Sequence, residues 1–545
     1  MTDSGEQALV DHLGYDAMSY LLNCEPQALA ARINNPSENL LEAGQEAVLA
    51  IMRSHDEQLN SLDNHLSIRA NWAQHLAGRP NPESQNSVGN IMRVMSGGEV
   101  VTASSTLGRL EATLVSLGME QFPGLLVDTS TDPYTPLGLP SSTHSHPVNL
   151  EFERLALDDP DFKRFFTSHS PESGWSGDIV RSTGQGGGHQ LWGFSATIVR
   201  SGWTLARVES LAPGPEAFAE AILATVRNVR KAVNGRNVTI PARIGLTGVL
   251  LPDGTDGLDL GWARVRRSDA RDELFTERTS LTGSMTGVDP HGGHVEISFR
   301  GDIVVEMEVP YEIAIRSFDV DKDWTGEGPA SYRPIEQAIE NLRLAMLLAY
   351  PEHPPVLHLS WLATVDPLAQ SNGASWGDPS RAVGLRPTKL SVDKTAEWVD
   401  WAGKIAEHRT PEIRVAIRRM LASVGERADP VDKLIDAVIV WENLFGARTE
   451  TTLRVTSALA WLLGDSEDDR SARFQDYKEV YNFRSKVVHG DPVVDPKKVS
   501  LLAPRAVQTS IEALRVLFSK RQDLLRIKKS EDRSMEMILA RPRRE

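Results

Sequence analysis

The spacing of apolar residues changes twice along this 545-residue chain, and these changes restrict the folds open to it. Residues 1–125 carry apolar residues at helical spacing with few β-branched runs, which predicts a helical region. Between 149 and 333 several segments alternate apolar and polar residues, as strands do. Helical spacing returns at about Pro334. Because the chain is also too long for one hydrophobic core, we expect a multidomain α+β protein.

Turn-forming and helix-capping residues place the domain boundaries. The segment 126–148 is rich in Pro, Ser and Thr and is predicted to be a linker. A mixed α+β middle domain is expected at 149–333, with a helix around Pro215–Val233, and a mainly helical connecting region at 334–430. Residues 431–545 contain further stretches at helical spacing, the first of them preceded by Asp429-Pro430 as cap and first turn. They predict an all-α bundle of about four helices.

Two pairs of neighbouring strands are predicted in the middle domain. Residues 243–251 and 258–265 flank the turn-forming Pro252-Asp253-Gly254. Residues 295–299 and 303–309 alternate apolar and polar side chains on either side of a second turn. Each pair is expected to form a hairpin.

Composition excludes several classes of protein. No run of about 18 uncharged apolar residues is present, so we expect no membrane span. Met1–Glu6 lack the basic stretch and apolar run of a secretory signal. The single cysteine, Cys24, cannot form an internal disulfide and excludes a structural zinc site built on thiolates. These features predict a cytoplasmic protein.

Charge is distributed unevenly along the chain. The net charge is −16, which argues against non-specific coating of nucleic acid. From Val431 to the end, 21 Lys and Arg stand against 18 Asp and Glu, a net +3, whereas residues 1–430 carry −19. From Arg470 to Glu545 the balance is 18 against 10, or +8. The basic end would admit a polyanion that the rest of the chain repels.

Three other motifs are weak indicators of function. Gly14–Leu22 and Gln27–Ile33, joined by a tight turn, resemble a helix-turn-helix unit of bacterial regulators and antitoxins. Few of its side chains suit base reading, which favours packing or docking over DNA binding: Gln27, Arg32 and Asn34. Gly184–His189 is glycine-rich but no Gly-Lys-Ser/Thr follows, so a flexible turn is favoured over a P-loop. His291 and His294 lack a clear third metal ligand.

One predicted helix of the bundle carries an arginine among its apolar residues. In a helix from about Asp468 to His489, a rotation of about 100° per residue places Arg484 in the stripe of Tyr477 and Tyr481. A guanidinium in that position requires a partner charge, an interface or an anionic ligand. His489 lies about 140° from Arg484, at the end of the helix. One copy of the chain is therefore poorly arranged to direct both side chains at one atom.

These residues resemble the closing motif of HEPN domains. The motif is Arg-x-x-x-x-His, here Arg484–His489 with Ser485 after the arginine and Gly490 after the histidine. Upstream, Trp441–Gly446 and Leu453–Ala460 are similar to the first two helices of the Apea-like subgroup. The resemblance is confined to the C-terminal region.

The resemblance implies a metal-independent endoribonuclease that needs no cofactor and works as a homodimer, its two motif helices meeting across a two-fold axis. His489 would act as general base on a ribose 2′-hydroxyl or as general acid to the leaving 5′-oxygen. Arg484 would hold the phosphate and offset the charge of the transition state, and Ser485 would orient the phosphate or a catalytic group. Glu442 and Arg454 occupy supporting positions. RNA is the expected substrate because the chemistry uses the 2′-hydroxyl.

Two functions are consistent with these features. The first is an endoribonuclease effector of a bacterial defence or toxin-like system, whose N-terminal region carries a sensor or inhibitor partner. The second is a non-catalytic HEPN dimerisation scaffold or regulator with a DNA- or protein-binding N-terminal region. In the second, Arg484 pairs with a carboxylate such as Glu442, and His489 caps the helix C-terminus, where a cation is favourable.

Overall fold

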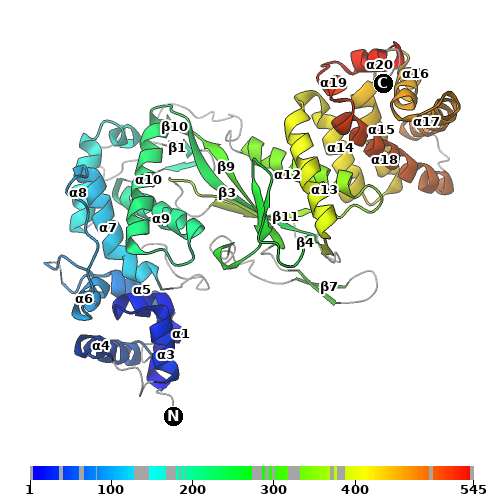
Figure 1. Cartoon of the computed structure of the whole chain (residues 1–545). Helices are drawn as coiled ribbons and strands as arrows, with labels where there is room; N and C mark the ends of the chain where they lie inside the picture. Colours follow the sequence, from blue (N-terminus) through cyan, green and yellow to red (C-terminus); the bar gives the residue numbers. More distant parts are fainter. Residues whose placement is uncertain are drawn as a thin grey trace.

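The chain extends from a helical N-terminal end through a central antiparallel sheet to a helical C-terminal end, and it is an α+β protein (Figure 1). The computed structural model describes residues 4–35, 41–60, 67–81, 83–127, 146–166, 179–182, 186–188, 191–272, 285–288, 294–297, 301–316, 332–368, 373–376, 387–489 and 495–539.

Helices fill the N-terminal end, as predicted. They are α1 (Ser4–Leu13), α2 (Tyr15–Leu21), α3 (Pro26–Asn34), α4 (Ala43–Asn60), α5 (Ile68–Ala77), α6 (Val88–Met95) and α7 (Arg109–Leu125). One hydrophobic core joins them to three later helices, α8 (Pro147–Asp158), α9 (Leu191–Glu209) and α10 (Pro215–Val233). Most of the predicted linker, residues 128–145, lies outside the described residues. The helices on its two sides nevertheless share one core, so the linker does not separate two packing units.

The helix-turn-helix-like segment forms two short helices, α2 and α3, with Pro26 in the first turn of α3 as expected. Arg32, one of its three candidates for base reading, is buried and donates to Glu6 at 3.1 Å and to Glu46 at 3.0 Å. These carboxylates belong to α1 and α4. Arg32 therefore ties three helices together and is not available to read a DNA base, which agrees with the packing role that the sequence favoured.

A pair of stacked histidines lies between α4 and α5. The rings of His55 and His75 are 3.8 Å apart at their centroids, and both contact Trp72 edge-on. Burial and the neighbouring His55 lower the pKa of His75 to about 4, and burial lowers that of His55 although Asp56 opposes the shift. The stack is therefore stable in its neutral form.

Acidification is expected to destabilise this end of the molecule. A histidine whose folded pKa is lowered contributes stability above its unfolded pKa of about 6.5 and loses it as the pH falls towards the folded value. We expect the melting temperature of the wild type to fall more steeply between pH 6.5 and 4.5 than that of His75→Phe, which keeps a stacked ring. Equal slopes in calorimetric scans of the two proteins would contradict this account.

The central sheet has the strand order β12-β11-β3-β9-β6-β5, and all its pairs are antiparallel. The strands are β3 (Val238–Thr247), β5 (Leu258–Asp259), β6 (Arg264–Arg267), β9 (Ile303–Tyr311), β11 (His358–Thr364) and β12 (Gly373–Trp376). Ala242, Ile244 and Leu246 of β3 are fully buried on one face. On the other face the indole of Trp361 lies over Gly245, where a Cβ atom would collide with it. The side chains therefore alternate between two packed faces.

The predicted hairpins do not form. Strand β9 lies between β3 and β6, so the strands on either side of Pro252 are not partners. A separate pair joins β7 (Met285–Val288) to β8 (His294–Ile297), whereas β9 belongs to the central sheet. The alternation identified the strands, but it carries no information about which strands pair.

The predicted connecting region contributes to the sheet. Residues 334–430 contain helices, but they also supply β11, which pairs along β3, and β12 at the edge. Two small sheets complete the strands: β4 (Val249–Leu250) with β13 (Thr388–Lys389), and β1 (Ile179–Ser182) between β2 (Gly186–Gly188) and β10 (Ile313–Arg316). A boundary at residue 333 would cut through one folding unit.

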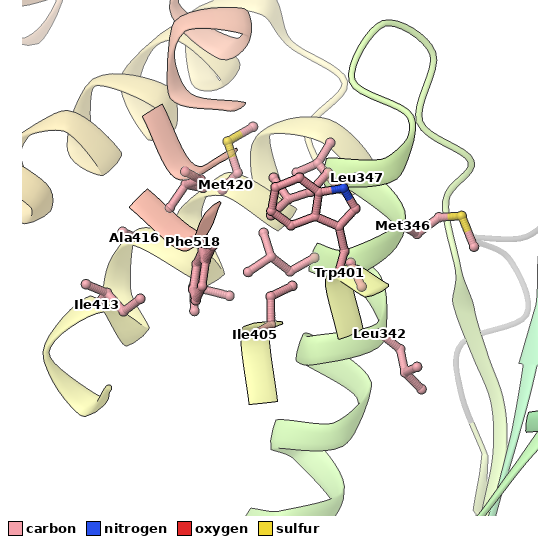
Figure 2. Close-up of a cluster of buried hydrophobic side chains, with 14 of the residues drawn as sticks. Leu342, Met346, Leu347, Trp401, Ile405, Ile413, Ala416, Met420 and Phe518 are labelled. Atoms are coloured by element: carbon pink, nitrogen blue, oxygen red, sulfur yellow. The ribbon is translucent and has the colours of Figure 1, made fainter. Parts of the chain in front are cut away.

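The C-terminal helices are α12 (Tyr332–Ala349), α13 (Val392–His408), α14 (Arg414–Gly425), α15 (Pro430–Phe445), α16 (Thr451–Leu463), α17 (Glu467–Val488), α18 (Pro496–Ser519), α19 (Gln522–Leu525) and α20 (Ser530–Leu539). Their core is continuous with one face of the central sheet. Figure 2 shows part of the junction, where Leu347, Trp401, Met420 and Phe518 meet from α12, α13, α14 and α18. Among the described helices, none has both the length and the apolarity needed to cross a bilayer.

A buried arginine fastens α20 to the end of α15. Arg533 is 1% exposed and donates to the carbonyl oxygens of Leu444 and Ile527 at 2.7 Å and of Asn443 at 2.6 Å. Carbonyl groups at a helix C-terminus have no partner within the helix, so a cation there is favourable.

Candidate functional site

Caps fix the helices that carry the site. The Asp429 side chain accepts from Val431 N at 2.8 Å and begins α15, with Pro430 at the first position, as predicted. Ser466 accepts from Asp469 N at 3.1 Å at the start of α17. Asp495 accepts from Lys497 N at 3.0 Å at the start of α18. Each cap satisfies backbone donors that the helix leaves free.

An aromatic core holds α17 against α15 and α18. Trp441 is fully buried, donates from its indole nitrogen to Ser510 Oγ at 2.9 Å and meets the ring of Tyr477 edge-on at 5.7 Å. Glu442 follows Trp441 and therefore lies at the edge of this core. The rigid contact positions its carboxylate opposite the C-terminal half of α17.

Glu442 is the centre of a small polar cluster. Its Oε1 accepts from the Tyr481 hydroxyl at 2.6 Å, and its Oε2 accepts from Arg484 Nη2 at 3.2 Å. The side chains of Arg484 and Glu442 are 18% and 27% exposed. Burial and the adjacent carboxylate raise the pKa of Tyr481, so the hydroxyl stays protonated and donates. The partner charge that Arg484 requires is thus Glu442, as the second interpretation of the sequence specified.

The guanidinium keeps one donor without an acceptor. The Nε atom of Arg484 is buried and has no hydrogen-bond partner among the described residues. An unpaired buried donor costs about 1–3 kcal/mol. Arg484 is therefore oriented by Glu442 and keeps one Nε donor unsatisfied.

His489 and Ser485 lie on the same helix as Arg484. His489 is the cap residue at the end of α17, its backbone N–H bonds to Ser485 O at 3.0 Å, and its side chain is exposed. Ser485 is half-buried. Within the described part of the chain, neither side chain forms a hydrogen bond or ion pair. The imidazole is accessible to a substrate, and Gly490, where the chain was expected to turn away, lies outside the described residues.

The supporting residues differ in their environment. Glu442 joins the cluster, whereas Arg454 lies half-buried on α16 and its side chain has no hydrogen bond or ion pair to the rest of the described chain. Tyr481 had been assigned only to the apolar stripe. Its role as a donor to Glu442 follows from the packing of α15 on α17, which the sequence of α17 does not show.

A groove between α16 and α17 was not anticipated. Its volume is about 450 Å³, and Trp461, Arg470 and Phe474 are among the residues that line it. The two walls come from different helices, so the spacing within either helix gave no indication of it.

The glycine-rich segment and the pair His291 and His294 form no site among the described residues. Residues 184, 185 and 189 of the glycine-rich segment lie outside the described part, and so do residues 291–293. The segment 294–297 is described and forms strand β8. Across the described ranges, no group of three or more His, Cys, Asp or Glu side chains is arranged to hold a metal ion.

Comparisons with known protein families, with curated proteins and with solved structures gave no match.

Proposed function

We propose that the C-terminal helices form a HEPN-type, metal-independent endoribonuclease whose active site contains Arg484 and His489 from two copies of the chain. The observation that carries the proposal is the geometry of the Arg484 side chain. Glu442 holds it near the end of α17 with a free Nε donor, and the exposed His489 follows about 7.5 Å further along the helix axis. A fixed cation and an accessible imidazole, brought together from two copies, suit the cleavage of a phosphodiester.

Each side chain has a defined part in the reaction. His489 removes the proton of a ribose 2′-hydroxyl, or donates one to the departing 5′-oxygen. The 2′-oxygen attacks the adjacent phosphorus while the bond to the 5′-oxygen breaks, which leaves a 2′,3′-cyclic phosphate and a 5′-hydroxyl. Arg484 donates to the phosphate oxygens as their charge grows, and Ser485 orients the phosphate. DNA cannot react because it lacks the attacking hydroxyl.

A dimer is part of the proposal. Arg484 faces α15 while His489 points to solvent at the helix end, so the two side chains of one copy diverge. A second copy related by a two-fold axis can supply the complementary residue to each site. The role as effector of a bacterial defence or toxin-like system rests on the family resemblance alone.

The experiment is cleavage of structured and unstructured RNA by the full chain in EDTA, with DNA of the same sequence as a control and the oligomeric state measured in parallel. We expect RNA products ending in a cyclic phosphate and intact DNA. An intact dimer that cleaves neither RNA would instead support the alternative, a non-catalytic scaffold or regulator. The Arg484–Glu442 ion pair within one copy favours that alternative.

Arg484→Ala separates these two roles. If the arginine is catalytic, cleavage should fall by about 100-fold or more, as when one transition-state donor is removed. Stability should change by about 1 kcal/mol or less, because the ion pair is partly exposed and screened. Chemical denaturation and initial cleavage rates measure the two effects.

Arg419→Ala is the matched control, since Arg419 of α14 pairs at 2.8 Å with Asp436, which precedes Glu442 by about 9 Å along the axis of α15. It should retain full cleavage. A large loss of stability in Arg484→Ala with unchanged cleavage would assign the arginine a structural role only.

A further inference from the structure

We infer that the substrate is unpaired RNA, bound along the groove between α16 and α17 with one base against Trp461 and the strand running along α17 to His489. The inference rests on the proposed ribonuclease function and adds where the substrate lies and which form of RNA it is.

The groove contains a stacking surface. Trp461 is 37% exposed although it is a large aromatic side chain. The Arg470 guanidinium lies 4.3 Å from the centre of its ring and is fixed by a bond from Nε to Gly464 O at 3.1 Å. Phe474 also lines the groove, whose volume of about 450 Å³ is in the range of small-molecule sites. Exposed aromatic rings beside arginine are the usual platform for unpaired bases.

A line of polar residues leads from this groove to the proposed active site. Ser471, Lys478, Asn482, Ser485 and His489 follow one another at intervals of three, four or seven residues, so they lie on one side of α17. The line is about 27 Å long, and it contains no carboxylate. Its residues are exposed apart from Ser485, which is half-buried.

The carboxylates beside this line are neutralised. Beyond its first turn, α17 carries only Asp476 and Glu479, which pair with Arg505 at 2.9 Å and with Lys498 at 2.8 Å on α18. Lys478 and the exposed Lys486 are left to act on a ligand. In a chain with a net charge of −16, this surface is complementary to a polyanion.

The opposite wall adds a cation. Arg454, Ser457 and Trp461 are spaced by three and four residues and lie on one face of α16. Helices α16 and α17 pack as an antiparallel hairpin, so Arg454 lies about 10 Å from Trp461 in the direction of His489. Arg454 is therefore placed to bind a phosphate between the stacked base and the cleaved bond.

The acidic first turn of α17 determines where the bound RNA strand can begin. Glu467, Asp468 and Asp469 would repel phosphate there, and Glu467 lines the groove. A base can enter the groove while its backbone continues only towards the basic side. Trp461 therefore marks one end of the bound strand.

The test is binding of a fluorescent 2′-O-methyl RNA, which cannot be cleaved, to the full chain, followed by anisotropy. We expect Trp461→Ala to weaken binding of the single strand about tenfold, as the loss of one stacked base does. Trp461→Phe should restore most of it, and duplex of the same sequence should bind more weakly. Lys478→Glu should weaken binding and reduce its salt dependence, whereas Lys231→Glu, the same charge change on α10, should not.

Two results would overturn the inference. In the first, the wild type cleaves RNA and Trp461→Ala binds RNA as tightly as the wild type. That result would leave the ribonuclease function in place and remove only the proposed binding site along α17. The other is dissociation of the dimer by Trp461→Ala in sedimentation, which would assign the groove to a second copy. A wild type that neither binds nor cleaves RNA would remove the proposed function itself.

Discussion

Replacing His489 by alanine is expected to lower the rate of RNA cleavage by about 10²–10⁴-fold, the usual contribution of a general acid or base. The fold should not change, because the side chain is exposed and makes no hydrogen bond or ion pair to the described residues. Binding of uncleavable RNA should fall far less than cleavage, because Trp461, Arg454 and Lys478 still contact the strand. Single-turnover cleavage, anisotropy and thermal unfolding give the three measurements.

His353→Ala is a suitable control because His353 is also exposed and lies far from the motif in sequence. It should behave as the wild type in all three measurements. Cleavage by His489→Ala at the wild-type rate would exclude His489 from the chemistry.

Replacing Arg533 by alanine is expected to destabilise the protein by about 3 kcal/mol or more. The change leaves three carbonyl groups at the junction of α15 and α20 without their donor, and each buried unpaired group costs about 1–3 kcal/mol. Lysine should restore only part of the loss because an ammonium does not reproduce the planar fork of guanidinium donors. Equilibrium unfolding in urea measures the effect.

Arg526→Ala tests whether loss of any nearby arginine has the same result. Arg526 is exposed between α19 and α20, so its removal should change stability by about 0.5 kcal/mol or less. If Arg533→Ala unfolds at the same urea concentration as Arg526→Ala, the buried bonds do not contribute as described.

The sequence predicted helices well where a capping residue and an apolar stripe at helical spacing indicate the same bounds. The helix around Pro215–Val233 is α10 with the same bounds, and Asp429 caps α15 through the bond expected of it. The sheet was less predictable. Strand β3 pairs with β9 and with β11, which are separated from it by long stretches of chain, and apolar alternation contains no such information.

The candidate site was predictable only where its residues lie on one helix or in a known motif. The helical projection showed that Arg484 needed a partner, and the motif order suggested Glu442. The Tyr481 hydroxyl and the groove at Trp461 depend on how α15, α16 and α17 pack together. Conversely Arg32, which suited base reading by its chemistry, is buried because Glu6 and Glu46 approach it from other helices.

The junction in Figure 2 determines where the chain can be cut into fragments that still fold. Phe518 of α18 packs in the same core as Trp401 and Leu347, which belong to helices before the predicted bundle. A fragment that starts at Val431 would expose this apolar surface to water and would be prone to aggregate. The bundle is therefore not an independent domain. A chimaera in which it stays folded would have to include α12 and the strands packed against it, because the sheet and the bundle share one core.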